Sequence, residues 1–160
     1  MELAEINVGR LRAPVDDPLV AEFMGALDEI NALADRSPGF RWRFQTEDGN
    51  ATSVRPYEDD SILINVSVWA SVEALGDYVY RSDHTAFLRR RREWFERLSE
   101  VVVALWWVPD GTRPTIEEAV ARLDHLRRHG PTPHAFTFRD RFGPEGADQV
   151  PADERDVCLA

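Results

Sequence analysis

Residues 62–96 read ILINVSVWASVEALGDYVYRSDHTAFLRRRREWFE, and this stretch decides the fold. The segment 62–69 is rich in β-branched residues that alternate with others, which predicts a strand. Ser71 is a favourable N-cap, and apolar residues recur at helical spacing after it, so a helix is expected there. A bend at residues 81–83 separates this helix from a second one, predicted over 84–98, which carries a run of four arginines at 89–92.

The flanking segments supply further strands and helices. Asp17-Pro18 is typical of a helix start, because Asp caps and Pro suits the first helical position. Thr115 and Glu118 form a capping box for a later helix. The polar segment 45–61 is longer than a hairpin turn and is either a mobile flap or a structured excursion. The remaining predicted elements are strands over 2–10, 40–44 and 101–108, an edge strand over 135–138, and helices that end before Ser37 and Gly130.

The order of these elements is typical of a ferredoxin-like α+β fold. Its βαββαβ plan is an antiparallel sheet with helices on one face, here followed by a C-terminal helix and a short strand. We expect a single domain over residues 1–142 and a disordered acidic tail over 143–160. The other sheet face would be bare and rich in Trp. A second copy would cover it, so we predict a homodimer in which two sheets close into a dimeric α+β barrel.

Composition excludes several classes of function. The 160 residues carry a formal net charge of -10, and an acidic surface repels nucleic acid. No apolar segment approaches the roughly 20 residues that cross a membrane, so no membrane partner is expected. All 19 basic residues are Arg, which excludes a Schiff-base lysine. Cys158 has no partner for an intrachain disulfide, and the N-terminus does not resemble a signal peptide, so a cytoplasmic location is expected.

Two polar residues fall on the apolar side of the arginine-rich helix. At 100° per residue, His84 and Arg91 share one stripe with apolar residues. One interpretation places both in a pocket, where Arg91 binds a carboxylate, phenolate or enolate and His84 acts as acid or base. The other is structural: Arg91 pairs with an acid such as Glu5, and His84 packs against the helix turn. The stripe is His84, Phe87, Leu88, Arg91, Phe95 and Leu98.

The strand at 62–69 has two different faces. Ile62, Ile64, Val66 and Val68 form an apolar face that should pack under the helices. The other face, which includes Asn65 and Ser67, would then look into the barrel beside Asn7, or else lie at a solvated interface. Elsewhere, His125 and His129 have the spacing of a metal pair, but no third ligand is evident, so no metal site is predicted.

Four segments carry a family resemblance. They are NVSVWASVEALGDYVYRSDHTAFLRRRREWFE, LWWVP, RPTIEEAVARLDHLRRHGPTP and AFTF, which begin at residues 65, 105, 113 and 135. The chain resembles, over most of residues 1–140, an uncharacterised bacterial family known as domain of unknown function 3291. That family is similar to the dimeric α+β barrel proteins, which include antibiotic-biosynthesis monooxygenases. The resemblance implies the fold and the dimer, and it does not imply a reaction.

Haem-degrading barrel proteins share two features with this chain, an asparagine in the first strand, here Asn7, and a VW-x-S join, here at 68–71. The positions that correspond to their Trp and axial His are Tyr78 and Leu88. Because the axial ligand is missing, neither haem nor another cofactor is expected.

The resemblance also implies a candidate site. In cofactor-free oxygenases of this superfamily, Asn, Trp, Tyr and Arg groups line an apolar cavity that stabilises a substrate anion. The matching substrate-binding residues here would be Asn7, Asn65, Trp69, Tyr78 and Tyr80, with His84 and Arg91 as catalytic residues. The function expected is therefore that of a small-molecule-binding barrel, with a cofactor-independent monooxygenase acting on an aromatic or polyketide-like compound as the best candidate. The alternative is a non-catalytic ligand-binding or structural dimeric barrel.

Overall fold

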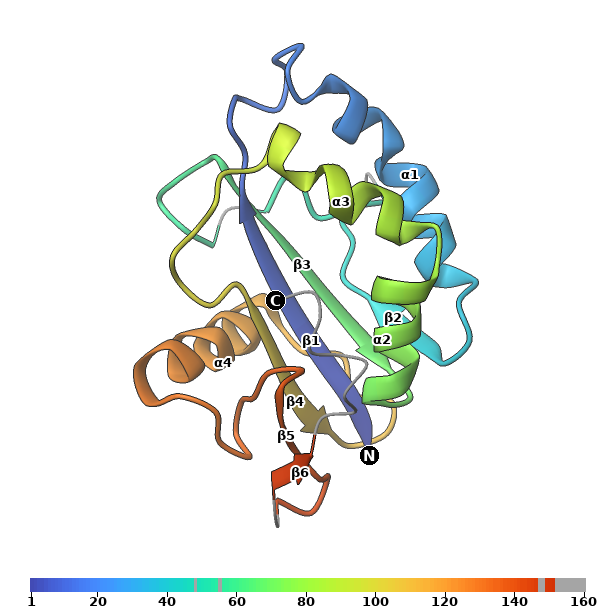
Figure 1. Ribbon diagram of the computed structural model, residues 1–160, viewed down its shortest axis with the longest axis vertical. Coiled ribbons are helices and arrows are strands. Elements are labelled where there is room, and N and C mark those ends of the chain that lie inside the picture. Colours follow the sequence, from blue (N-terminus) through green and yellow to red (C-terminus); the bar gives the residue numbers. More distant parts are fainter. Residues whose placement is uncertain (48, 55, 147–148, 152–160) are drawn as a thin grey trace.

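A four-stranded antiparallel sheet runs through the middle of the molecule (Figure 1). The computed structural model describes residues 1–47, 49–54, 56–146 and 149–151. The strands lie in the order β2–β3–β1–β4, which is the order of the ferredoxin-like plan, so the predicted α+β fold class is confirmed. Their bounds are β1 Glu2–Arg10, β2 Phe40–Arg43, β3 Ile62–Trp69 and β4 Val103–Val108.

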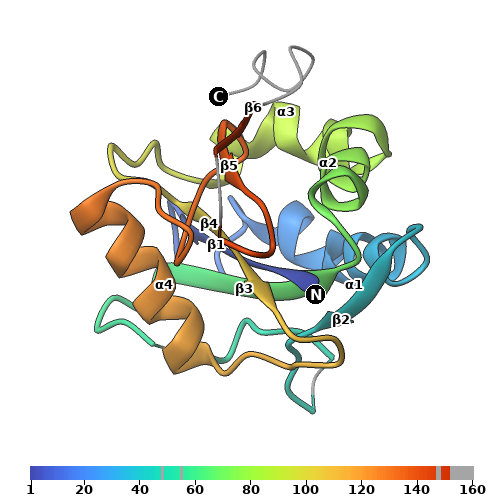
Figure 2. The ribbon, with the colours of Figure 1, turned by 90° about the horizontal axis from the view of Figure 1, so that it is seen from below.

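Helices lie on both sides of this sheet. Figure 2 shows α2 and α3 on one side and α4, with the segment that joins β2 to β3, on the other. The fourth helix lies against β1 and β4. We call the surface under α1, α2 and α3 the first face of the sheet, and the surface under α4 the second face. The bounds are α1 Ala21–Asp35, α2 Val72–Arg81, α3 His84–Trp94 and α4 Ile116–His129.

The predicted orientation of β3 is wrong. Its continuous apolar face packs on α4, in one cluster with Ala119 and Leu123. Trp69, on the other face, packs in a cluster with Leu75 of α2. The prediction placed the more apolar face under the helices that follow β1 and β3. However, α4 also needs an apolar surface to pack on, and the apolar face of β3 supplies it. Burial of the large Trp69 ring compensates for the polar residues on the face under α2.

The described residues of the segment 45–61 pack on the second face, as expected for a structured excursion. Val54 and Tyr57 pack against the apolar cluster on the second face. Thr46 closes a small loop, since its backbone N–H donates to the carbonyl of Asn50 at 2.9 Å. The second face is therefore covered by α4 and this segment. It is not the bare face from which the homodimer was predicted.

Two helix boundaries differ from the prediction. The first helix starts at Ala21 and not at Asp17, whose carboxylate accepts instead from the backbone N–H of Leu19, in the turn before the helix, at 2.8 Å. The third helix ends at Trp94 and not at residue 98. Phe95 is extended and forms a bridge with Leu11, so the chain leaves the helix to pair beside β1.

Two predicted helix caps are confirmed. The Ser71 side chain accepts from the backbone N–H of Ala74 at 3.2 Å, and the Thr115 side chain accepts from that of Glu118 at 3.2 Å. Both contacts satisfy backbone donors that a helix N-terminus otherwise leaves unpaired. They fix where α2 and α4 begin.

The C-terminal region departs from the predicted edge strand. Phe136 exchanges two backbone hydrogen bonds with Leu105, which makes a single bridge beside β4 and not a strand over 135–138. A small hairpin follows, formed by β5 (Asp140–Phe142) and β6 (Gln149–Pro151). This hairpin overlaps the start of the tail predicted over 143–160, and the disorder of that tail stays a prediction. Residues 152–160, with Cys158, lie outside the described residues.

Candidate functional site

A buried carboxyl group lies on the first face of the sheet. Glu5 is on the central strand β1, directly opposite Ser67 of β3, and is only 5% exposed. Asn7 Nδ2 donates to Glu5 Oε1 at 2.7 Å, and Ser67 Oγ donates to Glu5 Oε2 at 2.9 Å. Trp69 Nε1 donates to Ser67 Oγ at 2.9 Å. We call these four residues the Glu5 centre.

Burial decides the protonation of this carboxyl group. Loss of hydration raises the pKa of Glu5 to about 7, although the hydrogen bonds from Asn7 and Ser67 lower it in part. The carboxyl is therefore divided between its acid and its base form near neutral pH. That is the condition under which one group can both accept and return a proton.

Aromatic side chains of the helices pack onto the Glu5 centre. The Trp69 and Tyr78 rings are stacked with centroids 5.0 Å apart, and Tyr78 lies 4.7 Å from the His84 ring. Burial lowers the pKa of His84, with a partial opposing effect from the carbonyl of Val79. Burial also raises the pKa of the Tyr78 phenol. At neutral pH both rings are therefore uncharged.

Solvent reaches the first face of the sheet beside the Glu5 centre. Asn7, Asn65 and Val103 lie side by side on three strands. Asn65 is exposed and the other two are half-buried. On either side of this open row the sheet is covered by apolar clusters, one around Trp69 and one around Trp94. The open row is thus a polar strip between two parts of the core, and Asn7 connects it to Glu5.

The structure brings five of the seven predicted site residues into this region. Asn7, Trp69, Tyr78 and His84 form a connected series with Glu5, and Asn65 is paired with Asn7.

Tyr80 and Arg91 lie apart from that series. Tyr80 packs edge-on against Phe138 at 5.6 Å. Arg91 is exposed on the last turn of α3. The suggested Arg91–Glu5 pair does not form, because Glu5 bonds to Asn7 and Ser67 instead.

The sequence interpretation missed Glu5 as a functional group. One signal could have found it: Glu5 stands between Ala4 and Ile6 in the longest predicted strand, and length favours a central place in the sheet. A carboxylate on a strand with neighbours on both sides is poorly hydrated. Its pKa is raised unless a cation pairs with it. Here the partners of Glu5 are the neutral side chains of Asn7 and Ser67, so its pKa stays high.

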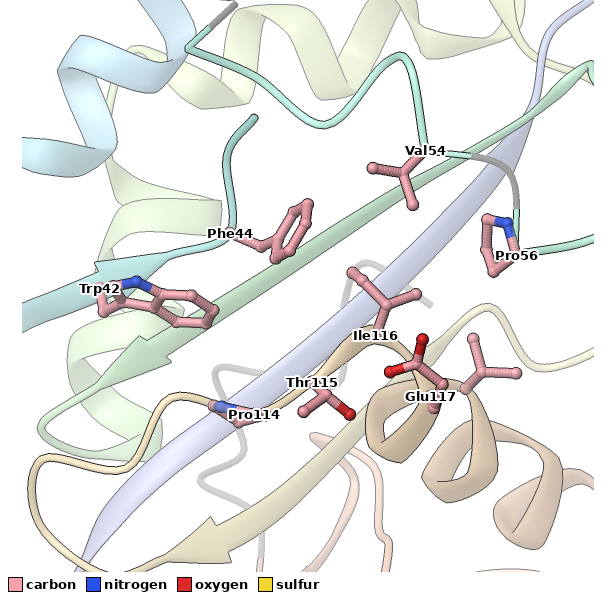
Figure 3. Close-up of a pocket in the computed structure, with 9 residues that line it drawn as sticks. Trp42, Phe44, Val54, Pro56, Pro114, Thr115, Ile116 and Glu117 are labelled. Carbon is pink, nitrogen blue, oxygen red and sulfur yellow. The ribbon is translucent and has the colours of Figure 1, made fainter. Parts of the chain in front are cut away.

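Two cavities lie on the second face. The larger, about 780 Å³, is the α4 groove, lined by Trp42, Phe44, Val54, Pro56, Ile116 and Val120 among others (Figure 3). The smaller, about 330 Å³, is lined by residues that include Arg10, Tyr57 and Arg127. None of the seven predicted site residues lines either cavity.

A third histidine joins the pair on α4. His125 has its ring centroid 4.5 Å from that of His129 and 4.6 Å from that of His134. Arg122 donates to the His134 carbonyl at 2.8 Å, which holds the loop against the helix. Within the described ranges, no set of three or more His, Cys, Asp or Glu side chains is arranged to hold a metal ion.

None of the helices in the described part of the chain is both long enough and apolar enough to span a membrane.

Comparisons with known proteins agree with the sequence resemblance. SnoaB, a cofactor-independent oxygenase from Streptomyces nogalater, is 17% identical with a TM-score of 0.48, over 72% of this chain and 96% of that one. A Nitrosomonas europaea protein of unknown function is 11% identical (TM-score 0.48; 71% and 95% covered). A dabb family protein with a ferredoxin-like fold from Mesorhizobium loti is 17% identical (TM-score 0.42; 69% and 100% covered). No match was found among curated proteins. The model of the family "Domain of unknown function (DUF3291)" matches residues 2–153, and the chain belongs to this family.

Proposed function

We propose that the protein binds a small, largely apolar molecule at the open row and that Glu5 removes a proton from it. One observation carries this proposal: a buried carboxyl whose pKa is about 7 lies next to the one polar strip of the first face that solvent reaches through Asn65. A carboxylate that is half ionised at neutral pH is an effective general base, since it is present in the required form and holds a proton firmly. Asn7, Asn65, His84 and Arg91 have supporting roles.

Asn7 and Asn65 orient the polar group of the ligand, because Asn7 donates to Glu5 and the exposed Asn65 is paired with Asn7. His84 is held neutral by burial and so exchanges a proton without carrying a lasting charge. Arg91 follows His84 by two turns on the same side of α3 but is exposed and lies apart from Glu5. Its predicted role in binding an anionic group of the substrate applies only to a ligand that extends along α3. Tyr80 has no part in this arrangement, since it faces Phe138.

The reaction class that suits these groups is cofactor-independent oxygenation. A phenol or enol loses its acidic proton to Glu5, and the electron-rich anion that results reduces dioxygen by adding to it at carbon. The peroxide formed takes the proton back from Glu5 and loses water, which leaves a new carbonyl group. The protein's contribution is to hold the substrate, take the proton and keep the anion in a weakly hydrated place. The substrate is accordingly aromatic or polyketide-like, with at least one acidic O–H or C–H group.

A non-catalytic role is the second candidate, and one observation favours it. None of the residues that surround Glu5 lines either cavity. If the first face admits no ligand, the Glu5 centre is a buried polar network that specifies the packing of the helices on the sheet.

The homodimer and the cytoplasmic location also remain parts of the proposal. Since α4 and the segment 45–61 cover the second face, two copies would have to meet through another surface. Sedimentation velocity at micromolar concentration tests the dimer, and a monomeric mass would refute it. The single cysteine in the sequence supports a reducing compartment, which cell fractionation tests.

The main test measures oxygen uptake with a tricyclic anthrone, whose ring methylene is acidic. Wild type should consume oxygen with a rate that rises through an apparent pKa near 7, and Glu5→Gln should lose most of that rate. Glu29→Gln, at an exposed position of α1, is the matched control and should behave as wild type. Quenching of Trp fluorescence measures binding separately. Binding without uptake would establish the non-catalytic ligand-binding role, and absence of both would refute the proposed site for this substrate class.

A further inference from the structure

We infer that the α4 groove is a second binding site, which takes a flat, neutral, largely apolar small molecule. Figure 3 shows its walls: Trp42 and Phe44 on one side, Val54 and Pro56 above, and the start of α4 with Ile116 opposite. The groove lies on the second face of the sheet, away from the Glu5 centre. The inference is therefore independent of the proposed proton transfer.

The size and lining of the groove fit a small molecule. Its volume of about 780 Å³ falls inside the range of roughly 300–1,000 Å³ typical of ligand pockets. Seven of its nine lining residues are apolar or aromatic, so a ligand is held mainly by burial of apolar surface. The two polar ones, Thr115 and Glu117, are both exposed at the mouth.

The aromatic corner of the groove favours a ring. Trp42 and Phe44 have centroids 6.4 Å apart and planes at 85°. A planar ligand that lies on one of these rings meets the other edge-on, and both geometries are favourable for aromatic pairs. A branched aliphatic molecule of equal size would gain burial but not these contacts.

The walls are held in place before any ligand binds. Trp42 is paired with Val68 of β3, and Phe44 donates its backbone N–H to the Val66 carbonyl at 2.8 Å. The backbone N–H of Val54 donates to the carbonyl of Ala51 at 3.1 Å. Across the groove, the Thr115 cap fixes the first turn of α4. A preformed site loses little conformational entropy on binding.

Charge selects against anions. Glu117 is the one charged residue that lines the groove in the described structure. Its carboxylate accepts from its own backbone N–H and from Thr115, which lowers the pKa of Glu117 and keeps it ionised. The chain as a whole carries a net charge of -10. A neutral ligand meets no repulsion here, whereas a sulfonate or carboxylate does.

The test uses N-phenyl-1-naphthylamine, a neutral fluorophore, and 8-anilinonaphthalene-1-sulfonate, its anionic relative. The neutral probe should bind at one site per chain, and roughly tenfold more tightly than the anionic one. Val120→Trp fills the groove from α4 and should weaken the neutral probe by at least about tenfold. Val15→Trp is the matched control at an exposed valine outside the groove, and it should leave binding unchanged.

Circular dichroism melts establish that each variant is folded. If Val120→Trp is unfolded, Val54→Arg places a charge in the opposite wall and should have the same effect on the probe. Probe binding that survives a folded groove variant would overturn the inference. So would a wild-type dimer that the groove variants convert into a monomer in sedimentation velocity, since the groove would then be an interface between two copies of the chain.

Discussion

The Glu5→Gln variant should gain stability relative to wild type as the pH rises. The folded pKa of Glu5 is about 7, against an ordinary value of 4.5. At roughly 1.4 kcal/mol for a change of one in pKa, ionised Glu5 destabilises the fold by roughly 3 kcal/mol at high pH. Gln keeps the size and most of the hydrogen bonds of the side chain but cannot ionise.

The direction follows from which state binds more protons. Between pH 4.5 and about 7 the folded Glu5 is protonated while the unfolded one is ionised. The free energy of unfolding therefore falls as the pH rises, and it levels off above the folded pKa. At a pH of about 5.5 roughly 1 kcal/mol of this loss has developed, so roughly 2 kcal/mol remains to develop by a pH of about 8.5.

Urea unfolding followed by Trp fluorescence measures this effect. The comparison is the difference in unfolding free energy between Glu5→Gln and wild type at each pH, which removes the titration of every other group. This difference should move by roughly 2 kcal/mol in favour of the variant between a pH of about 5.5 and 8.5. Glu29→Gln should show no such trend, because residue 29 is exposed. A difference that does not change with pH would refute the perturbed carboxyl, and with it the basis of the proposed proton transfer.

Three further predictions test the fold. Gly39→Ala should lower the melting temperature more than Gly111→Ala does. Both glycines have φ near +80°, which costs roughly 1–2 kcal/mol for an L-residue. Only at Gly39 would the new methyl also fall 2.6 Å from a methyl of α2. Ser71→Ala should lower the unfolding free energy by about 1 kcal/mol through loss of the α2 cap; an unchanged value would mean that the cap contributes nothing. Burial and the nearby Arg122 lower the pKa of His134, so the unfolded chain binds protons more readily there and stability falls as the pH drops through about 6.5; His134→Gln should reduce that fall.

Local patterns in the sequence were enough for most of the fold. The apolar run at β4, the alternation in β2 and the caps at Ser71 and Thr115 each depend on neighbours within a few residues, and the structure has them as predicted. The end of α3 could not be predicted in the same way. Residues 95–98 continue the helical pattern, and the chain leaves the helix because Phe95 pairs with Leu11, a contact between segments far apart in sequence.

The prediction of which helices cover each face of the sheet failed for a related reason. Alternation along β3 shows that it has two faces, but it does not show which helices cover each. The choice depends on α4, almost fifty residues later, which takes the apolar face and leaves Trp69 under α2. Asn7, Asn65 and Trp69 share one face of the sheet whichever side that face is on. Tyr78 and His84 join them only because this face lies under α2 and α3.

The same reasoning explains why the proposed function depends on Glu5 rather than on the arginine-rich helix. Arginines on α3 are easily noticed, yet Arg90 is held by Glu22 and Glu93 at the surface, where such pairs contribute little. Glu5 is inconspicuous in the sequence, and its properties arise only when β3 and the helices remove its water. When neither a cation nor bulk solvent stabilises its ionised form, a carboxyl keeps its proton near neutral pH. It then gives the proton up on a small change in its surroundings. A ligand that covers the open row would make such a change, so binding and protonation at this site are necessarily linked.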